Sequence, residues 1–152
     1  MNVEFFAPGT PRPKGSKRHV GHGRMIEMSK HLPAWRTAVG HACRKAMRNR
    51  RPIPITRAVG VVLEFRFPRP KAHYRTGRFA GQLKPNAPIF HLQRPDIDKL
   101  ERAILDACTG IAFVDDSQVI SVTKRKGWGD ESNAGVRVSI LDVTGVAADE
   151  VA

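Results

Sequence analysis

The sequence predicts a single compact α/β domain in which two main helices pack against a mixed β-sheet. Its length of 152 residues is that of one ordinary domain and suffices to bury a core without disulfide bonds. Some segments alternate apolar and polar residues with the period of a strand, and two others repeat apolar residues with the period of a helix. The predicted elements follow the order β, α, β, loop, α, β, β without an internal repeat, which is typical of a mixed sheet.

The first half of the chain is predicted to form a strand, a helix and a second strand. Residues 3–7 have strand character, and the basic segment PRPKGSKR that follows them has the Pro and Gly content of a loop. Pro33 suits the first position of a helix. Strict alternation over residues 58–67 predicts a strand with one buried face. The apolar stripe of the helix consists of Trp35, Ala38, Val39, Ala42, Cys43 and Ala46.

The second half is predicted to begin with a long basic loop over residues 69–94, which we expect to be mobile. A helix from Lys99 follows and stops at Thr109-Gly110, where glycine suits the left-handed cap conformation. Two further strands are predicted near residues 119–126 and 135–143. The domain as a whole is predicted over residues 1–145, followed by a frayed tail over residues 146–152.

Charge is unevenly distributed along the chain. The sequence has 26 Lys and Arg against 14 Asp and Glu, a net charge of +12. Up to Arg94 there are 20 basic and 3 acidic side chains, whereas 6 basic and 11 acidic ones follow, six of the acids between Asp96 and Asp116. Such a balance argues against a neutral small-metabolite enzyme or an acidic tail, and favours a polyanion as the partner.

The two cysteines and the hydropathy pattern exclude several further classes. Cys43 and Cys108 have neither CxxC nor metal-ligand spacing, which argues against a zinc ribbon or a secreted disulfide scaffold. No apolar run approaches the roughly 20 residues of a membrane span, and the N-terminus does not resemble a signal peptide. We expect a soluble, unprocessed, cytoplasmic protein without a membrane partner or an organic cofactor.

The motif RPDID is the first candidate for chemistry. If Asp96 and Asp98 lie on an extended segment, the period of two puts both carboxylates on one side. Asp98 would then form a corner before the helix that begins at Lys99. Two carboxylates that point together repel each other unless a cation lies between them. Mg²⁺ is such a cation, since it takes one or two carboxylates together with phosphate oxygens.

A second acidic pair, Asp115 and Asp116, immediately precedes a predicted strand. If that strand pairs near the Asp98 corner, one of the two completes a site of three or four carboxylates. An isolated DxD or DD motif is more often a turn or a helix cap. Both motifs together in a basic chain favour metal-dependent cleavage of phosphodiesters in nucleic acid.

The segment from His91 to Trp128, HLQRPDIDKLERAILDACTGIAFVDDSQVISVTKRKGW, resembles the RusA family of Holliday junction resolvases. The N-terminal strand with its Pro/Gly/Lys loop is similar to the opening of that family. The resemblance implies a RusA-like fold and a two-fold homodimer. It also implies a metal-dependent endodeoxyribonuclease, often encoded by a prophage, that uses Mg²⁺ or Mn²⁺ to cut four-way DNA junctions in recombination and repair.

The resemblance also assigns roles to single residues. Asp96 and Asp98 match the first two catalytic acids, Asp116 matches the third with Asp115 beside it, and Asp106 matches a supporting aspartate. The chain departs from the family at two positions. Lys99 replaces a common Asn, and Arg102 replaces a functional lysine. Because a guanidinium does not lose its proton at neutral pH, we expect an electrostatic role for Arg102. The predicted catalytic set is Asp96, Asp98, Asp116 and Arg102, and the predicted metal ligands are Asp96, Asp98, Asp115 and Asp116.

Phosphate contacts are expected from the basic residues near these acids. The predicted DNA-binding residues are Lys14, Lys17, Arg18, Arg94 and Lys99. Trp128 is a candidate for stacking on exposed bases, whereas Trp35 belongs to the buried helical stripe. One alternative is a non-enzymatic, basic nucleic-acid-binding protein, but it leaves the clustered acids unexplained. Another is a phosphoacceptor receiver domain, for which the strand order and the charge are wrong.

Overall fold

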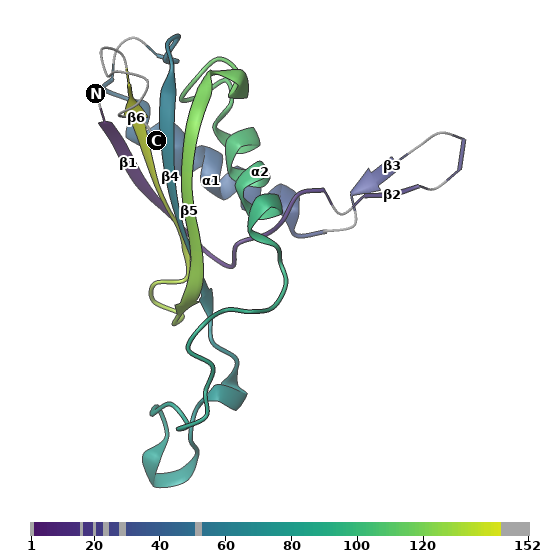
Figure 1. Cartoon of the computed structure of the whole chain (residues 1–152), viewed down its shortest axis with the longest axis vertical. Coiled ribbons are helices and arrows are strands. Elements are labelled where there is room, and N and C mark those ends of the chain that lie inside the picture. The colour runs from purple at the N-terminus through teal and green to yellow at the C-terminus, as the bar shows by residue number, and fades with distance from the viewer. Residues whose placement is uncertain are drawn as a thin grey trace.

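The structure is a computed structural model that describes residues 2–15, 17–19, 21–22, 25–27, 30–50 and 53–143, with only the backbone described at 17–19 and 25–27. The predicted fold class is confirmed, because one α/β domain contains a mixed four-stranded sheet and two helices. Besides the predicted elements, Lys17–His19 (β2) and Met25–Glu27 (β3) pair as a small antiparallel ribbon apart from the main sheet (Figure 1). At Lys17 and Arg18 the structure therefore has a strand where the sequence predicts a loop. The predicted tail over residues 146–152 lies outside the described residues.

The main sheet consists of Asn2–Pro8 (β1), Val59–Pro68 (β4), Val119–Gly129 (β5) and Gly135–Asp142 (β6). Its strands lie in the order β1-β6-β4-β5. β6 is antiparallel to both of its neighbours, whereas β4 and β5 pair in parallel. β1, β4 and β5 therefore run in the same direction, and β5 is an edge strand (Figure 1).

Both helices, Leu32–Met47 (α1) and Ile97–Cys108 (α2), cover the same face of this sheet (Figure 1). α1 lies in the connection from β1 to β4, and α2 in the connection from β4 to β5. Both connections join parallel strands and step in the same direction across the sheet. The right-handed rule for such crossovers therefore puts both helices on one side. Neither helix, and no other helix in the described part of the chain, is long and apolar enough to cross a membrane.

The core lies between the helices and the sheet. The predicted stripe of α1 faces it through Trp35, Val39 and Cys43, which are buried, with the three alanines of the stripe partly buried beside them. Cys43 and Cys108 are both free and buried where α1 packs against α2. The predicted alternation in β4 is confirmed, because the side chains directed at the helices are all buried: Val59, Val61, Leu63, Phe65 and Phe67.

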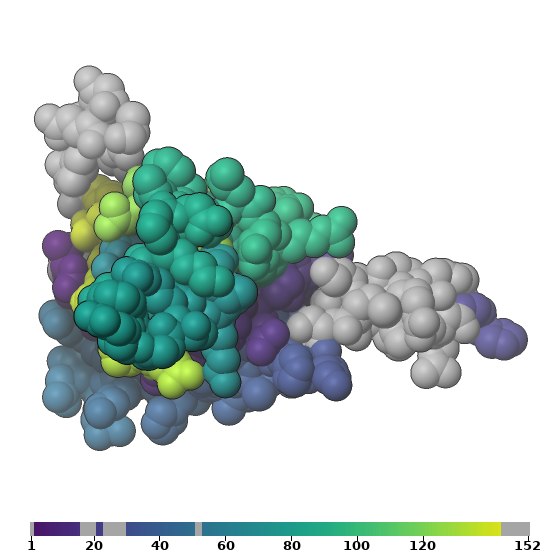
Figure 2. Space-filling model, turned by 90° about the horizontal axis from the view of Figure 1, so that it is seen from below, coloured from purple at the N-terminus to yellow at the C-terminus, as the bar shows by residue number. Residues whose placement is uncertain are grey.

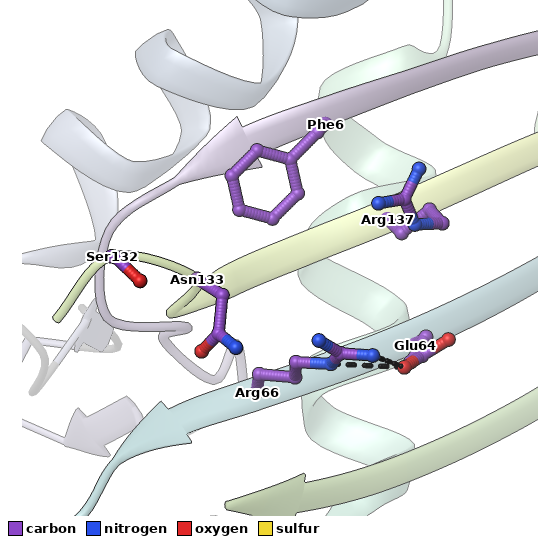
Figure 3. A pocket seen from close by; sticks show the side chains of 6 residues that line it. All are labelled: Phe6, Glu64, Arg66, Ser132, Asn133 and Arg137. Carbon is purple, nitrogen blue, oxygen red and sulfur yellow. Dashed lines mark hydrogen bonds and ion pairs between the residues drawn. The ribbon is translucent and has the colours of Figure 1, made fainter. Parts of the chain in front are cut away.

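The opposite face of the sheet is not covered by any described helix or strand, and it carries paired charges beside the exposed apolar side chains of Phe6 and Val62. A shallow hollow of about 200 Å³ lies on it, beside Phe6, Arg137 and the residues of the turn before β6 (Figure 3). Glu64 accepts a hydrogen bond from Arg66 Nη2 at 2.6 Å and pairs with Arg125 at 3.1 Å. Paired charges of this kind are typical of a sheet face that contacts water.

Residues 69–94 form an arm that projects from the end of the sheet where β4 and β5 finish (Figure 1). Figure 2 looks at the molecule from this end, with the arm in teal. The arm folds back on itself, because Arg75 N donates to Gln82 O at 2.8 Å and Lys84 N donates to His73 O at 2.9 Å. The predicted lack of helices and strands is confirmed apart from two short 3-10 turns. The mobility of the arm stays a prediction.

Gly135→Ala is expected to destabilise the fold strongly. Gly135 begins β6, between β1 and β4, with φ +149°, a conformation that residues with a Cβ rarely adopt. A Cβ there would also overlap the carbonyl oxygen of Ala7 on β1. Strain and overlap together are expected to lower the free energy of unfolding, measured with urea, by about 3 kcal/mol or more. Gly127→Ala in β5 is the control, because a Cβ there meets no atom within 4 Å. Equal stability of the two variants would contradict this role of Gly135.

Candidate active site

Asp96 and Asp98 lie where the arm returns to the domain and α2 begins. Asp96 is extended, with φ −70° and ψ 143°, and caps the helix, which starts at Ile97. The predicted corner at Asp98 is therefore wrong by two residues: the corner is Asp96, and Asp98 lies in the first helical turn. The backbone N–H groups of that turn have no partner within the helix, so negative charge is favourable there. Both carboxylates are exposed, and among the described residues neither has a hydrogen bond or ion pair.

Lys126, which lies on β5, holds this corner in place from the sheet. This side chain lies on the same face of β5 as Lys124 and Trp128, which is the face covered by the helices, because Lys126 pairs in register with the buried Phe65. Its ammonium group donates to the carbonyl oxygen of Gln93 at 2.7 Å and to that of Pro95 at 2.9 Å. Lys126 thus fixes the backbone immediately before Asp96.

Basic residues surround the corner. Arg94 and Lys99 line a hollow of about 150 Å³ together with Asp96. Arg102 lies one helical turn after Asp98 on the same side of α2, and a Cβ added to Gly15 would be 3.3 Å from its guanidinium. The structure therefore puts these three basic side chains close to Asp96 and Asp98. The predicted DNA contacts Lys17 and Arg18 belong to β2, and their side chains lie outside the described part of the structure.

The second acidic pair lies in a 3-10 turn, Asp116–Gln118 (η3), directly before β5. Gln118 anchors this turn, because its side-chain amide donates to the carbonyl oxygens of Ile55 and Arg57 at 2.9 and 2.8 Å. Both carboxylates are fully exposed and lie close together. A side-chain hydrogen bond between them lowers the pKa of Asp115 and raises that of Asp116. Further repulsion from Asp106 also raises the pKa of Asp116.

Asp106, which lies on α2, has a structural role. Lys14 forms an ion pair with it, and Arg36 Nη2 on α1 donates to the same carboxylate oxygen at 2.9 Å. Desolvation raises the pKa of Asp106, but the hydrogen bonds from Lys14 and Arg36 outweigh this effect and leave it below its usual value. Lys14 N also donates to Lys99 O at 3.0 Å. Asp106 therefore ties the N-terminal segment, α1 and α2 together, and Lys14 is engaged within the protein.

The two acidic pairs lie at opposite ends of α2. Because β4 and β5 are parallel, α2 runs back along them, so the residues before α2 and those before β5 are far apart (Figure 1). Asp116 interacts with Asp106, which lies eight residues and hence about 12 Å along the helix from Asp98. Among the described residues, no group of three or more His, Cys, Asp or Glu side chains could hold a metal ion. Within one chain, Asp96 and Asp98 are not brought together with Asp116.

Each pair by itself fits a divalent cation. Mg²⁺ commonly binds through only one or two carboxylates and completes its shell with water and phosphate. The negative charge of Asp115, which contributes to the raised pKa of Asp116, would be offset by a cation between the two carboxylates. Asp96 and Asp98 offer free carboxylate oxygens beside basic residues, where a metal-bound phosphate would be neutralised. The donor set of both pairs therefore suits a hard, oxygen-preferring metal.

An aromatic cluster near the corner is only partly anticipated by the sequence. Trp128, a predicted stacking residue, contacts His91 with ring centroids 4.4 Å apart, and His91 stacks on Phe67 at 4.3 Å. No sequence pattern indicates His91, which belongs to the aperiodic end of the arm. The alternation in β4 puts Phe67 on the helix side but does not reveal its neighbours. This cluster lies in the wall of a hollow next to Arg94 and Pro95.

Comparison with known proteins identifies the family. The model of the family described as endodeoxyribonuclease RusA matches residues 8–141, which include β4, β5, nearly all of β6, both helices and both acidic pairs. The sequence matches no curated protein. The resemblance of the segment from His91 to Trp128 is confirmed by a match that extends over most of the 152 residues. The chain therefore belongs to the RusA family of endodeoxyribonucleases.

Proposed function

We propose that this protein is a metal-dependent endodeoxyribonuclease that resolves four-way (Holliday) DNA junctions by paired phosphodiester hydrolysis. The observation that carries the proposal is the exposed pair of Asp96 and Asp98, which has no ion-pair partner in the described structure although three cations lie nearby. Membership of the RusA family supports DNA as the substrate. The proposed setting is DNA recombination and repair in the cytoplasm of a bacterium, with a bacterial or prophage gene as the source.

In this proposal Asp96, Asp98 and Asp116 hold Mg²⁺ or Mn²⁺, with Asp115 as a further ligand. A bound divalent ion supplies an acidified water and positive charge for the phosphate oxygens. The protein's own contribution is to hold the acids in position. Lys126 fixes the backbone before Asp96, and Gln118 fixes the turn that carries Asp116.

The basic residues hold the DNA. Arg94 and Lys99 contact phosphates beside the acids, and Lys17 and Arg18 contact them from β2. Arg102 stabilises the charge that develops on the scissile phosphate, because its guanidinium lies one turn from Asp98 and keeps its proton. Lys14 also contacts a phosphate, and its ion pair with Asp106 and its backbone hydrogen bond to Lys99 O hold the N-terminal segment on α2.

The separation of the acids supports a homodimer with shared sites. If Asp116 serves the same metal as Asp96 and Asp98, it has to come from a second copy, since α2 keeps the pairs apart within one chain. A two-fold dimer then contains two identical composite sites. Two such sites match the paired cuts in opposed strands that resolution of a four-way junction requires.

The alternative is a non-enzymatic protein that binds nucleic acid through its basic surface. It is favoured by the 20 basic and 3 acidic residues up to Arg94. This alternative predicts that the protein binds branched DNA but does not cleave it under any metal condition. A junction-cleavage assay with and without divalent metal therefore separates the two functions.

The protein is expected to cut a labelled four-way junction in Mg²⁺ or Mn²⁺ but not in excess chelator. Ca²⁺ should support binding with little cutting, because its larger and looser shell positions water and phosphate poorly. Asp98→Asn should abolish cleavage and leave junction affinity unchanged or slightly higher, since it removes one metal ligand and one negative charge. Glu131→Gln, at an exposed acid away from α2, is the matched control. Near wild-type cleavage by Asp98→Asn would remove Asp98 from the site.

A mixture of Asp98→Asn and Asp116→Asn subunits is expected to recover nicking of one strand, although each variant alone is inactive. In a shared-site dimer, the mixed species has one site with both substitutions and one intact site. The measurement is single-turnover cleavage after the two variants are mixed under conditions that exchange subunits. If the mixture stays inactive while exchange is demonstrated, both acidic pairs act within one chain.

Arg102→Ala is expected to lower the single-turnover rate at saturating protein by about 100-fold, because it removes a charge that stabilises the transition state. Arg102→Lys should restore most of this rate. Lys99→Ala should instead weaken binding and lower the log-log salt slope by about 0.9, with the saturated rate nearly unchanged. Arg48→Ala, at an exposed arginine after α1, controls for loss of charge alone. If Arg102→Ala changes only affinity, Arg102 is an ordinary phosphate contact.

A further inference from the structure

A pocket of about 440 Å³ lies at the root of the arm and has no role in the proposed chemistry. One wall is the N-terminal segment over residues 10–13, and the other is the returning end of the arm over residues 91–95. The ends of β4 and β5 contribute Phe67 and Trp128. The volume is within the range of about 300 to 1,000 Å³ that is usual for small-ligand pockets.

Aromatic rings form much of this pocket. Phe67 and His91 stack with an interplanar angle of 29°, and His91 meets Trp128 at 51°. The Trp128 indole N–H donates to Phe90 O at 3.2 Å, which fixes the ring, and the guanidinium of Arg69 lies 5.6 Å from its centroid. Phe67 and His91 are buried, so the partly exposed Trp128 is the ring that offers a preformed surface on which a planar ligand can stack.

His91 also carries an unsatisfied polar atom. The residue is only 4% exposed, and its Nδ1 is buried without a hydrogen-bond partner in the described structure. Burial, and then the charge of Lys126, lowers its pKa and keeps the imidazole neutral at physiological pH. Most buried polar atoms in folded proteins have a partner in the protein or in ordered water, so packing within the chain alone does not account for this nitrogen.

The charges around the pocket select an anionic ligand. Arg12 and Arg94 are the only charged residues that line this pocket in the described structure, and no acidic residue lines it. Arg94 also lines the adjoining hollow that contains Asp96 and Lys99, as do Pro13 and Pro95. A planar group in the pocket would therefore carry its attached phosphate towards the acids of α2.

We propose that this pocket binds a single unpaired nucleobase of DNA, stacked against Trp128, with the adjoining phosphate at Arg94. This inference rests on the proposed function for the identity of the nucleic acid and deepens it. The pocket holds a base that has left the stack at the branch point. It thereby sets which phosphate lies beside Asp96. The chemistry recognised is that of an aromatic base joined to a phosphate, which a continuous duplex does not expose.

The test is binding of a single-stranded oligodeoxynucleotide of about eight nucleotides in chelator, where no cleavage occurs. Binding should quench Trp128 fluorescence, and Trp128→Phe should remove this quenching because Trp35 is buried in the core. Trp128→Ala should weaken binding about 10-fold, as expected for loss of one stacked base, without changing the log-log salt slope. Trp128→Phe should retain most of the affinity, and Phe79→Ala, which alters an aromatic residue elsewhere on the arm, should bind normally.

The possible outcomes separate this proposal from the proposed function. Absence of quenching together with normal binding by Trp128→Ala overturns the base pocket, whether or not the wild-type protein cuts junctions. Quenching that Trp128→Phe abolishes supports the pocket even if junction cleavage is never seen, in which case only the nuclease proposal fails. If Trp128→Ala does not fold, as circular dichroism would show, the comparison of wild type with Trp128→Phe decides. A reduced salt slope for folded Trp128→Ala would overturn the stacking role, since this substitution removes no charge.

Discussion

The parallel pairing of β4 with β5 governs where the functional side chains lie. Two adjacent parallel strands cannot be joined by a tight turn, so the chain has to return along the sheet before β5 begins. The arm and α2 make that return. Because α2 runs against the strands, the acids before it and the acids before β5 are held at its two ends. The parallel pairing of β4 with β5 thus divides the candidate metal ligands into two pairs.

The contacts that hold each pair come from different layers of the fold. Lys126 reaches the Asp96 corner from the sheet, whereas Gln118 fixes the turn of Asp116 through the carbonyl oxygens before β4. Between them, Asp106 joins Lys14 and Arg36 across three segments. The contacts of Lys126 and Gln118 act on the backbone, and those of Asp106 join side chains that are not among the candidate metal ligands. The site carboxylates are left exposed, and the rigidity around them belongs to residues that need not touch a substrate.

Periodicity made most of the fold predictable. The alternation in β4 and the apolar stripe of α1 depend on burial against one partner layer. Such patterns can be recognised within a short stretch of sequence. The extended conformation predicted for Asp98 is wrong because aspartate is also a favoured N-cap residue, and Asp96 takes that position. The distance between the acidic pairs could not be predicted, since it depends on which strand β5 joins. The pocket at His91 could not be predicted either, because its walls come from three segments distant in sequence.

The position of β5 at the edge of the sheet has a consequence for self-association. An edge strand presents unpaired backbone groups that can recruit the same strand of another molecule and extend the sheet into an aggregate. In β5 this edge contains three consecutive basic residues, Lys124, Arg125 and Lys126. Two such strands aligned edge to edge would set cation against cation at the centre of the junction between sheets. The same run of lysine and arginine therefore disfavours fibre-like growth along this edge of the sheet.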